Sequence, residues 1–216
     1  QLLELDQRDK LHNCVKVIVA EVDWQGLNGH VVNDAMKVTI AGHAGLMLLG
    51  LENDFMDEVR TIQVCRQEFD DNLESDAVYA TETVSGRARS DGTTILSWHH
   101  VMNARCGGEK NIVIHELAHH FDRRDGQLSG TLAFDNPVDQ DRWEIVVAEE
   151  HADLCVAAAA GQWTILRHYG AKNRTEFFAV ACEAFFESPD RLQRSHAELY
   201  SLLSRFFNLN TAEWVA

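Results

Sequence analysis

An apolar segment that carries two histidines and a glutamate constrains this chain more than any other feature. Residues 111–126 read NIVIHELAHHFDRRDG, in which His115 and His119 stand four residues apart with Glu116 between them. A spacing of four returns a helix to the same face one turn later, so both imidazoles would point at one metal ion. Glu116 follows about 100° round the helix, within reach of a water in the open position of the metal. The segment therefore predicts the active-site helix of a zinc hydrolase over residues 109–122, with Glu116 as general base.

The HExxH pattern is short, and a chain with 11 histidines can contain it by accident. Its apolar flanks argue against accident, because charged and imidazole side chains are seldom placed in an apolar helix unless something pairs with them. A zinc ion is the simplest partner for two histidines on one face.

Composition and charge narrow the function classes. The 216 residues suit one domain with a substantial core, and a formal net charge of −15 without a Lys/Arg-rich run argues against direct nucleic-acid binding. The longest strongly apolar run, residues 44–51, is too short to span a bilayer. The five cysteines are odd in number and form no CxxC pair, which indicates reduced thiols in a cytoplasmic protein.

Hydrophobic periodicity predicts a mainly helical α+β fold with a small sheet ahead of the active-site helix. A loop rich in Gly, Asp and Asn is expected over 122–141. Strands are expected at 58–65, 77–84 and 93–98, with their pairings left open. The expected single domain over 1–216 has a helical N-terminal part (1–55), the small sheet (56–98), the active-site helix (109–122) and a helical C-terminal part (140–208).

Catalytic zinc needs three protein ligands and one open position, so a third ligand must lie elsewhere. Asp125 has the spacing of the extended pattern HExxHxxGxxH/D, but that geometry needs a glycine where this chain has Asp122. Glu176 and Glu183 lie seven residues apart on one face of a predicted apolar helix. One carboxylate would bind the metal and the other would hydrogen-bond a ligand histidine. Periodicity alone leaves the two roles open.

Several other histidines show no metal-ligand spacing. His43 fits a core or surface position, whereas His99 and His100 fit surface positions or positions just outside the ligand shell of a site. Residues 149–151, with the sequence EEH, resemble a ligand cluster on a helix, and a solvated helix face explains them about as well.

Two blocks of the chain resemble the MtfA family, the Mlc titration factor A metallopeptidases, which are related at the active site to the anthrax lethal factor peptidase. They are NIVIHELAHHFDRRDG at 111–126 and TEFFAVACEAFFESP at 175–189, with the tripeptide HYG at 168–170 before the second. In that family the runs are similar to HExxHxLDxxxG and Y-x6-E-x-F-A-V-x-x-E-x-F-F. The resemblance covers most of the chain, including SG at 85–86 and TILSW at 94–98.

The resemblance implies which later glutamate binds zinc. His115 and His119 match the first two ligands and Glu176 matches the third, which leaves Glu183 to hydrogen-bond a ligand histidine. Asp122, one turn beyond His119 on the same face, is expected to be a structural carboxylate beside the site rather than a fourth ligand. The implied cofactor is one zinc ion per chain.

The resemblance also implies a zinc-dependent peptidase of the gluzincin type with a zincin-like α+β fold. Glu116 would take a proton from the attacking water and pass it to the leaving amine. Tyr169 matches the tyrosine that hydrogen-bonds the transition-state oxygen. By analogy with related peptidases, segment 93–98 is expected to be an edge strand that pairs with an extended peptide substrate. The residues expected to line this edge are Ile95, Leu96, Ser97 and Trp98.

A protein-binding role is the alternative. The family takes its name from sequestering a glucose-responsive transcriptional repressor, so hydrolysis can be weak or vestigial. The intact Glu116 and Tyr169 favour a peptidase. The residues leave open whether cleavage starts at the N-terminus, as in an aminopeptidase, or is internal.

Overall fold

The computed structural model describes residues 3–51, 59–70, 83–105, 110–122, 130 and 132–214. Its helices are α1 (Leu5–Glu21), α2 (Asp34–Met47), α3 (Trp98–Arg105), α4 (Ile112–Asp122), α5 (Pro137–Ala159), α6 (Arg174–Glu187), α7 (Pro189–Ser195) and α8 (Ala197–Phe207), with short 3-10 helices η3 (His168–Lys172) and η4 (Thr211–Trp214). Its strands are β1 (Asp23–Gly26), β2 (Thr61–Cys65), β3 (Phe69–Asp70), β4 (Thr83–Val84), β5 (Gly86–Ala88) and β6 (Thr93–Ser97).

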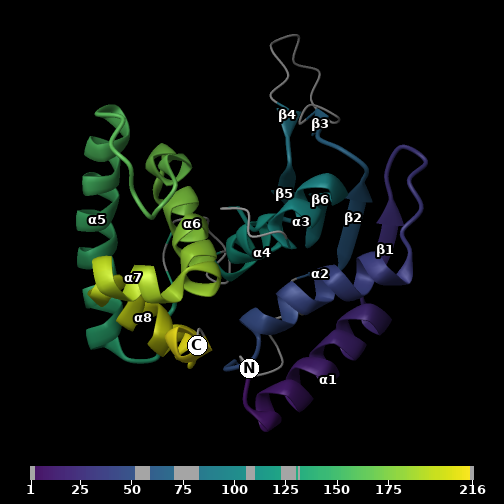
Figure 1. Cartoon of the computed structure of the whole chain (residues 1–216), viewed down its shortest axis with the longest axis horizontal. Coiled ribbons are helices and arrows are strands. Elements are labelled where there is room, and N and C mark those ends of the chain that lie inside the picture. Colours follow the sequence, from purple (N-terminus) through teal and green to yellow (C-terminus); the bar gives the residue numbers. More distant parts are fainter. Residues whose placement is uncertain are drawn as a thin grey trace.

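The HExxH helix α4 lies between two groups of helices (Figure 1). Helices α5 to α8 gather on one side of it, and α1 and α2 lie on the other, next to the sheet. All the described strands precede α4 in the chain. The prediction of a mainly helical α+β fold with a small sheet before the active-site helix is therefore confirmed. The single domain over 1–216 stays a prediction.

The four-stranded sheet has the order β1-β2-β6-β5. β1, β2 and β6 run parallel to one another, and β5 runs antiparallel to β6. The prediction that 93–98 forms an edge strand is therefore wrong, because β6 pairs with β2 on one side and with β5 on the other. Ile95, Leu96 and Ser97 are buried, and Trp98 already belongs to α3. All residues of β6 after Thr93 are buried, as expected of a strand that is covered on both faces.

The edge beside β6 is formed by β5, which has only three residues. Gly86 stands opposite Leu96, and the backbone N–H of Ser97 donates to the carbonyl of Ser85 at 2.9 Å. The expected strand at 77–84 lies mostly outside the described residues, and its last two residues form β4, which pairs antiparallel with β3. Among the described strands, β5 is therefore the short strand that lies nearest α4 at the end of the sheet.

Helices α4 and α6 pack against each other in the core, which explains their composition. All 11 residues of α4 are buried. On α6 the buried run extends over Phe177–Phe185, with Phe177, Phe178 and Phe185 fully enclosed. A polar side chain within these buried stretches must therefore find an internal partner, because it has no solvated face to turn toward.

The long helix α5 begins earlier than the sequence predicted. Pro137, which the predicted loop over 122–141 includes, occupies the first turn of α5, where its missing N–H and restricted φ are tolerated. The Asn136 side chain caps this turn by accepting from the backbone N–H of Val138 at 3.0 Å. The loop prediction was wrong at this end because an Asn-Pro pair is typical both of a turn and of a helix start.

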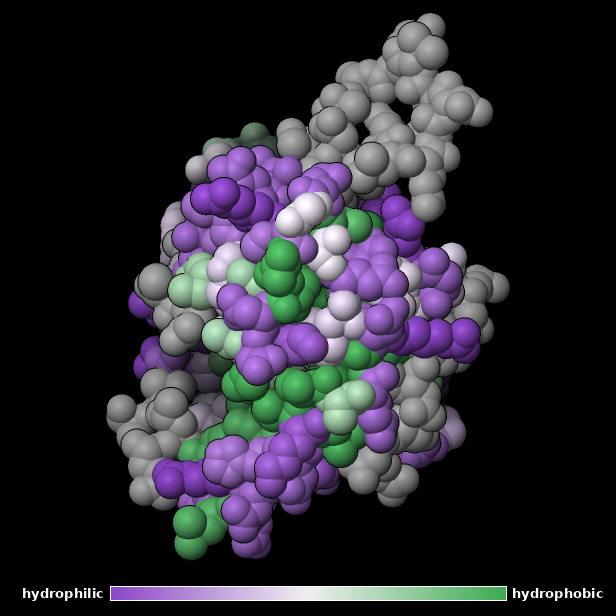
Figure 2. All heavy atoms as spheres, turned by 90° about the vertical axis from the view of Figure 1, so that its right-hand side faces the viewer, coloured by the Kyte–Doolittle hydropathy of each residue, from purple (hydrophilic) through white to green (hydrophobic). Residues whose placement is uncertain are grey.

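Part of the apolar surface of the N-terminal helices stays outside the core. Figure 2 shows apolar patches among largely polar atoms on the face that carries α1, α2 and β1. The exposed apolar side chains of this region include Val17, Val31 and Val38.

Within the described residues, no helix combines the length and apolar character needed to cross a bilayer. The described cysteines, Cys14, Cys65, Cys155 and Cys182, are free.

Candidate metal centre

Two histidines from α4 and one glutamate from α6 converge on a single point. The possible ligand atoms of His115, His119 and Glu176 all lie within 4.8 Å of one another. Nε2 of His115 is 3.0 Å from Oε2 of Glu176, and Nε2 of His119 is 3.6 Å from the same oxygen. The described part of the chain contains no second group of this kind. The structure thus brings together the three residues predicted as ligands, whereas Asp125 lies outside the described residues.

Local sequence explains how each side chain reaches this point. The four-residue spacing on α4 brings the two imidazole rings together, with centroids 5.0 Å apart. On α6, the Asn173 side chain caps the helix by accepting from the backbone N–H of Glu176 at 2.8 Å. This cap holds Glu176 in the first turn of α6, at the end that faces the histidines.

The donor set fits a divalent metal such as zinc. Two imidazole nitrogens and one carboxylate oxygen are the ligands of a common catalytic zinc site. Burial alone lowers the pKa of His115, but hydrogen bonds to Glu176 and Glu183 outweigh burial and raise the pKa to about 9. Burial opposes ionisation of Glu176, but its contacts with His115 and His119 hold the pKa of that carboxyl well below its usual range. The carboxylates around the histidines therefore favour a positive charge at this position.

Glu183 holds the other nitrogen of His115. Nδ1 of His115 donates to Oε1 of Glu183 at 2.7 Å, and the guanidinium of Arg167 donates to the same oxygen. The backbone N–H of Asn111 donates to Oε2 at 2.8 Å. Glu183 is 2% exposed and is itself held by these donors, so it fixes the imidazole with Nε2 turned toward Glu176.

Sequence reasoning missed Asn111 and Arg167. Oδ1 of Asn111 accepts from the backbone N–H of Ile114 at 3.2 Å, and its Nδ2 lies 3.0 Å from Nδ1 of His43 and 2.5 Å from Oε1 of Glu187. An asparagine just before an apolar helix is a recognisable cap signal. The links from Asn111 to α2 and α6 leave no local signal, because they depend on how the helices pack.

Glu116 is buried, with 5% of its surface exposed, on the side of α4 that faces β5. Burial raises the pKa of its carboxyl, whereas the neighbouring His115 and His119 lower it. Lys110, just before α4, contacts the Ser85 hydroxyl and is a further nearby cation. Burial lowers the pKa of Lys110, and so does the charge of Arg167. Glu116 is thus a buried carboxyl close to two imidazoles and an ammonium group, on the side of α4 that packs against the short strand β5.

Tyr169 lies at the mouth of the site. Its hydroxyl donates to Oε1 of Glu176 over a long 3.4 Å, and its ring centroid is 5.7 Å from that of His115. The side chain is 45% exposed. Nζ of Lys172 and the Arg167 guanidinium lie 5.6 Å and 5.9 Å from the ring centre. Tyr169 thus borders both the buried ligands and solvent.

Asp122 is buried at the last position of α4. Burial raises the pKa of the Cys182 thiol on α6, and the charges of Glu183 and Asp122 add to the rise. Asp122 therefore lies near α6, and its predicted role beside the site stays a prediction.

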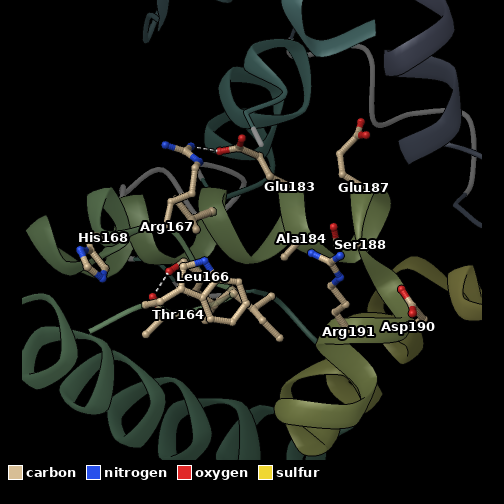
Figure 3. A pocket seen from close by; sticks show the side chains of 13 residues that line it. Thr164, Leu166, Arg167, His168, Glu183, Ala184, Glu187, Ser188, Asp190 and Arg191 are labelled. Carbon is tan, nitrogen blue, oxygen red and sulfur yellow. Dashed lines mark hydrogen bonds and ion pairs between the residues drawn. The ribbon is translucent and has the colours of Figure 1, made fainter. Parts of the chain in front are cut away.

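A pocket adjoins the site beside the ion pair of Arg167 and Glu183 (Figure 3). Its cavity volume is about 820 Å³. Figure 3 shows the Arg167 side chain reaching up to Glu183, with Arg191 entering from α7. The pocket lies between the 163–168 segment, α6 and the start of α7. Its volume is typical of cavities that accept a ligand.

Three histidines outside α4 have partners away from the candidate ligands. Nδ1 of His196 lies 2.6 Å from Oε2 of Glu150, and Nε2 of His151 is 3.6 Å from Sγ of Cys155. Nε2 of His100 is 3.2 Å from Oε1 of Glu68. None of these residues belongs to the ligand group of His115, His119 and Glu176.

Known proteins resemble this chain along nearly its whole length. A protein of Synechocystis sp., slr2042, is 30% identical over 215 residues, which cover 96% of this chain and 78% of that protein. Mlc titration factor A from Yersinia enterocolitica is 26% identical over 216 residues, covering 95% and 79%, and that from Serratia proteamaculans is 27% identical over 218 residues, covering 95% and 82%. The profile of the glucose-regulated metallo-peptidase M90 family matches residues 1–208. The chain therefore belongs to the glucose-regulated metallo-peptidase M90 family, and its zincin-like α+β fold agrees with this membership.

Proposed function

We propose that this protein is a zinc-dependent peptidase that holds one zinc ion through His115, His119 and Glu176. Membership of a metallopeptidase family makes metal-assisted peptide hydrolysis the general function. The observation that carries the proposal is the convergence of the three ligand atoms within 4.8 Å of one another, next to the buried carboxylate of Glu116. This constellation has the ligands of a catalytic zinc site and a base one residue from the first ligand.

Each residue has a distinct task in this proposal. A zinc ion in this position supplies Lewis-acid polarisation of the peptide carbonyl and makes a water molecule more acidic. The Glu116 carboxylate accepts a proton from the attacking water and delivers it to the leaving amine. The Tyr169 hydroxyl donates a hydrogen bond to the developing oxyanion. Glu183 accepts from Nδ1 of His115 and keeps Nε2 free to bind the metal.

The substrate backbone is proposed to pair with β5 instead of β6. β5 is the short strand beside Glu116, and among the described strands it pairs only with β6. An extended peptide added to this edge would lie against α4, where the base and the candidate ligands are. The 820 Å³ pocket beside Arg167 is the proposed site for a side chain of that peptide.

Metal analysis and turnover test the proposal together. Purified protein should contain about one zinc per chain and cleave chromogenic amino-acid or short-peptide substrates until a chelator is added. Glu116→Gln should retain the zinc and lose roughly 10²- to 10⁴-fold in kcat. Glu149→Gln, which changes an exposed glutamate of α5, is the matched control and should retain full activity. Protein that stays free of metal when zinc is supplied, or full activity of Glu116→Gln, would contradict the proposal.

A second candidate function is binding of a transcriptional repressor with little hydrolysis. The name Mlc titration factor A, carried by relatives in Yersinia and Serratia, favours it. A stable complex with a purified repressor of this type, together with no chelator-sensitive cleavage of a mixed peptide library, would support this alternative. Blocking the substrate N-termini in the same library would distinguish an aminopeptidase from an enzyme that cleaves internally.

A further inference from the structure

We propose that Gly86 is a positioning residue whose missing side chain makes room for the carboxylate of Glu116. An ideal Cβ at Gly86 would lie 2.6 Å from Oε1 of Glu116, 2.8 Å from its Cγ and 2.8 Å from Cδ1 of Ile112. These distances are far below the roughly 3.5–4.0 Å of favourable contact between heavy atoms. The Glu116 side chain therefore occupies the space that any other residue at position 86 would need.

Backbone conformation does not explain this glycine. Gly29, Gly92, Gly130 and Gly161 have positive φ angles, and Gly86 is not among them. An L-residue is therefore free to adopt the backbone conformation at position 86. A glycine within a strand weakens the strand and often marks a close approach of another group. Here that group is the proposed general base.

The backbone is held in place on both sides of this contact. β5 is held by β6, where Gly86 stands opposite the fully buried Leu96. α4 is buried along its whole length, including Ile112. An added methyl group would therefore be accommodated mainly by movement of the flexible end of the Glu116 side chain. This end carries the carboxylate on which the proposed reaction depends.

The consequence for catalysis rests on the proposed peptidase function. Relief of the contact requires the carboxylate to move by on the order of 1 Å, and misplacement on that scale lowers rates by about 10²-fold. None of the three atoms nearest an ideal Cβ at Gly86 belongs to His115, His119 or Glu176, so metal binding is expected to persist. Gly86→Ala should therefore lower kcat by about 10²-fold, with zinc content unchanged and KM little changed.

The matched control is Gly42→Ala on α2. An ideal Cβ at Gly42 meets nothing within 4 Å. The control variant should retain kcat, KM and zinc content. If Gly86→Ala had the kcat of the unaltered protein, or lost zinc in proportion to its activity, the positioning role would be wrong.

A double-mutant cycle tests the contact without any enzyme assay. Glu116→Ala removes both Cγ and Oε1, two of the three atoms nearest to a Cβ at Gly86. Gly86→Ala should lower the thermal midpoint of the metal-free protein less in the Glu116→Ala background than in the unaltered protein. If Gly86→Ala folds only together with Glu116→Ala, the contact is supported still more directly.

If Gly86→Ala lowered the thermal midpoint equally in the unaltered protein and in the Glu116→Ala background, the proposed contact would be wrong. This would hold even if the protein is an active peptidase. Conversely, a coupled cycle in a protein that cleaves no peptide would refute the proposed function and leave the packing role of Gly86 standing.

Discussion

Two clusters of histidine and glutamate lie on neighbouring parts of this molecule, and their environments differ sharply. His115 and His119 lie on the buried helix α4 and meet Glu176 from α6. Residues 149–151 lie on α5, where Glu149 is exposed and Glu150 is joined to His196 at the start of α8.

The difference shows that a sequence cluster is not by itself a site. The residues of α4 have no solvent to turn toward and converge with a carboxylate from another helix. The residues of α5 are consecutive, so they point in different directions around the helix and satisfy separate partners. Burial and convergence of separate elements distinguish the candidate metal centre from the α5 cluster.

The largest expected effect is loss of metal binding. Glu176→Ala removes the carboxylate next to both Nε2 atoms and should abolish stoichiometric zinc binding. Glu150→Ala removes a carboxylate of the α5 cluster and should leave one zinc per chain. Metal analysis after dialysis measures both variants. If the two retained equal amounts of zinc, the contrast between the clusters would be lost.

The next effect concerns turnover without a change in metal. Tyr169→Phe removes the hydroxyl proposed to stabilise the oxyanion, and loss of one such donor lowers kcat by roughly 10²- to 10³-fold. Steady-state kinetics on a cleaved peptide, with zinc content measured in parallel, tests this expectation. Tyr200→Phe is the matched control, because its hydroxyl donates to Oδ1 of Asn210, away from the candidate ligands. An unchanged kcat in Tyr169→Phe would remove Tyr169 from the mechanism.

A smaller effect is expected from Glu183, which holds His115 without facing the common ligand point. Glu183→Ala should weaken zinc binding about 10- to 100-fold, as changes to groups that orient a ligand histidine generally do. Competition with a metal-sensitive dye measures the affinity. The comparison with Glu176→Ala is decisive, since a larger loss in Glu183→Ala than in Glu176→Ala would exchange the two roles.

The pH dependence of zinc binding follows from the raised pKa of His115. In the metal-free protein the imidazole is protonated below about pH 9, and zinc must displace that proton. Apparent zinc affinity should therefore rise about tenfold per pH unit between pH 6.5 and 9.

The stability of the metal-free protein should change with pH in the opposite direction. The reason is that the pKa of His115 in the folded protein lies above the ordinary value of 6.5. The contribution of His115 to metal-free stability is complete below pH 6.5 and is lost as the pH rises through 9.

Dye competition at three pH values measures the affinity, and thermal unfolding in chelator measures the stability. An affinity that does not change with pH would show that no proton leaves when zinc binds.

The smallest effect belongs to the α5 cluster. The pair of Glu150 and His196 is partly exposed, and such ion pairs contribute below about 1 kcal/mol. Glu150→Gln should change the free energy of unfolding by no more than this and leave zinc content unchanged. Urea unfolding at neutral pH measures the stability difference. A loss of several kcal/mol would show that the α5 cluster is more important to the fold than its exposure indicates.

Local patterns predicted what lies within one element. The histidine spacing on α4, the apolar face of α6 and the sheet ahead of α4 follow from periodicities of 3.6 and 2. Segment 93–98 was misjudged as an edge because its β-branched and aromatic composition indicates a strand without revealing which strands flank it. The return strand β5, which covers β6, is only three residues long and leaves almost no sequence signal.

The sequence by itself determined that one apolar helix carries His115, Glu116 and His119 with the spacing of a metal site, because that arrangement depends only on helical geometry. Only the tertiary structure decided that Glu176 faces Nε2 of His115 and Glu183 faces Nδ1. The two glutamates share one face of α6, so their different roles depend on how α6 lies against α4. The fit of Glu116 against Gly86 was decided in the same way, by packing between segments that are distant in the chain.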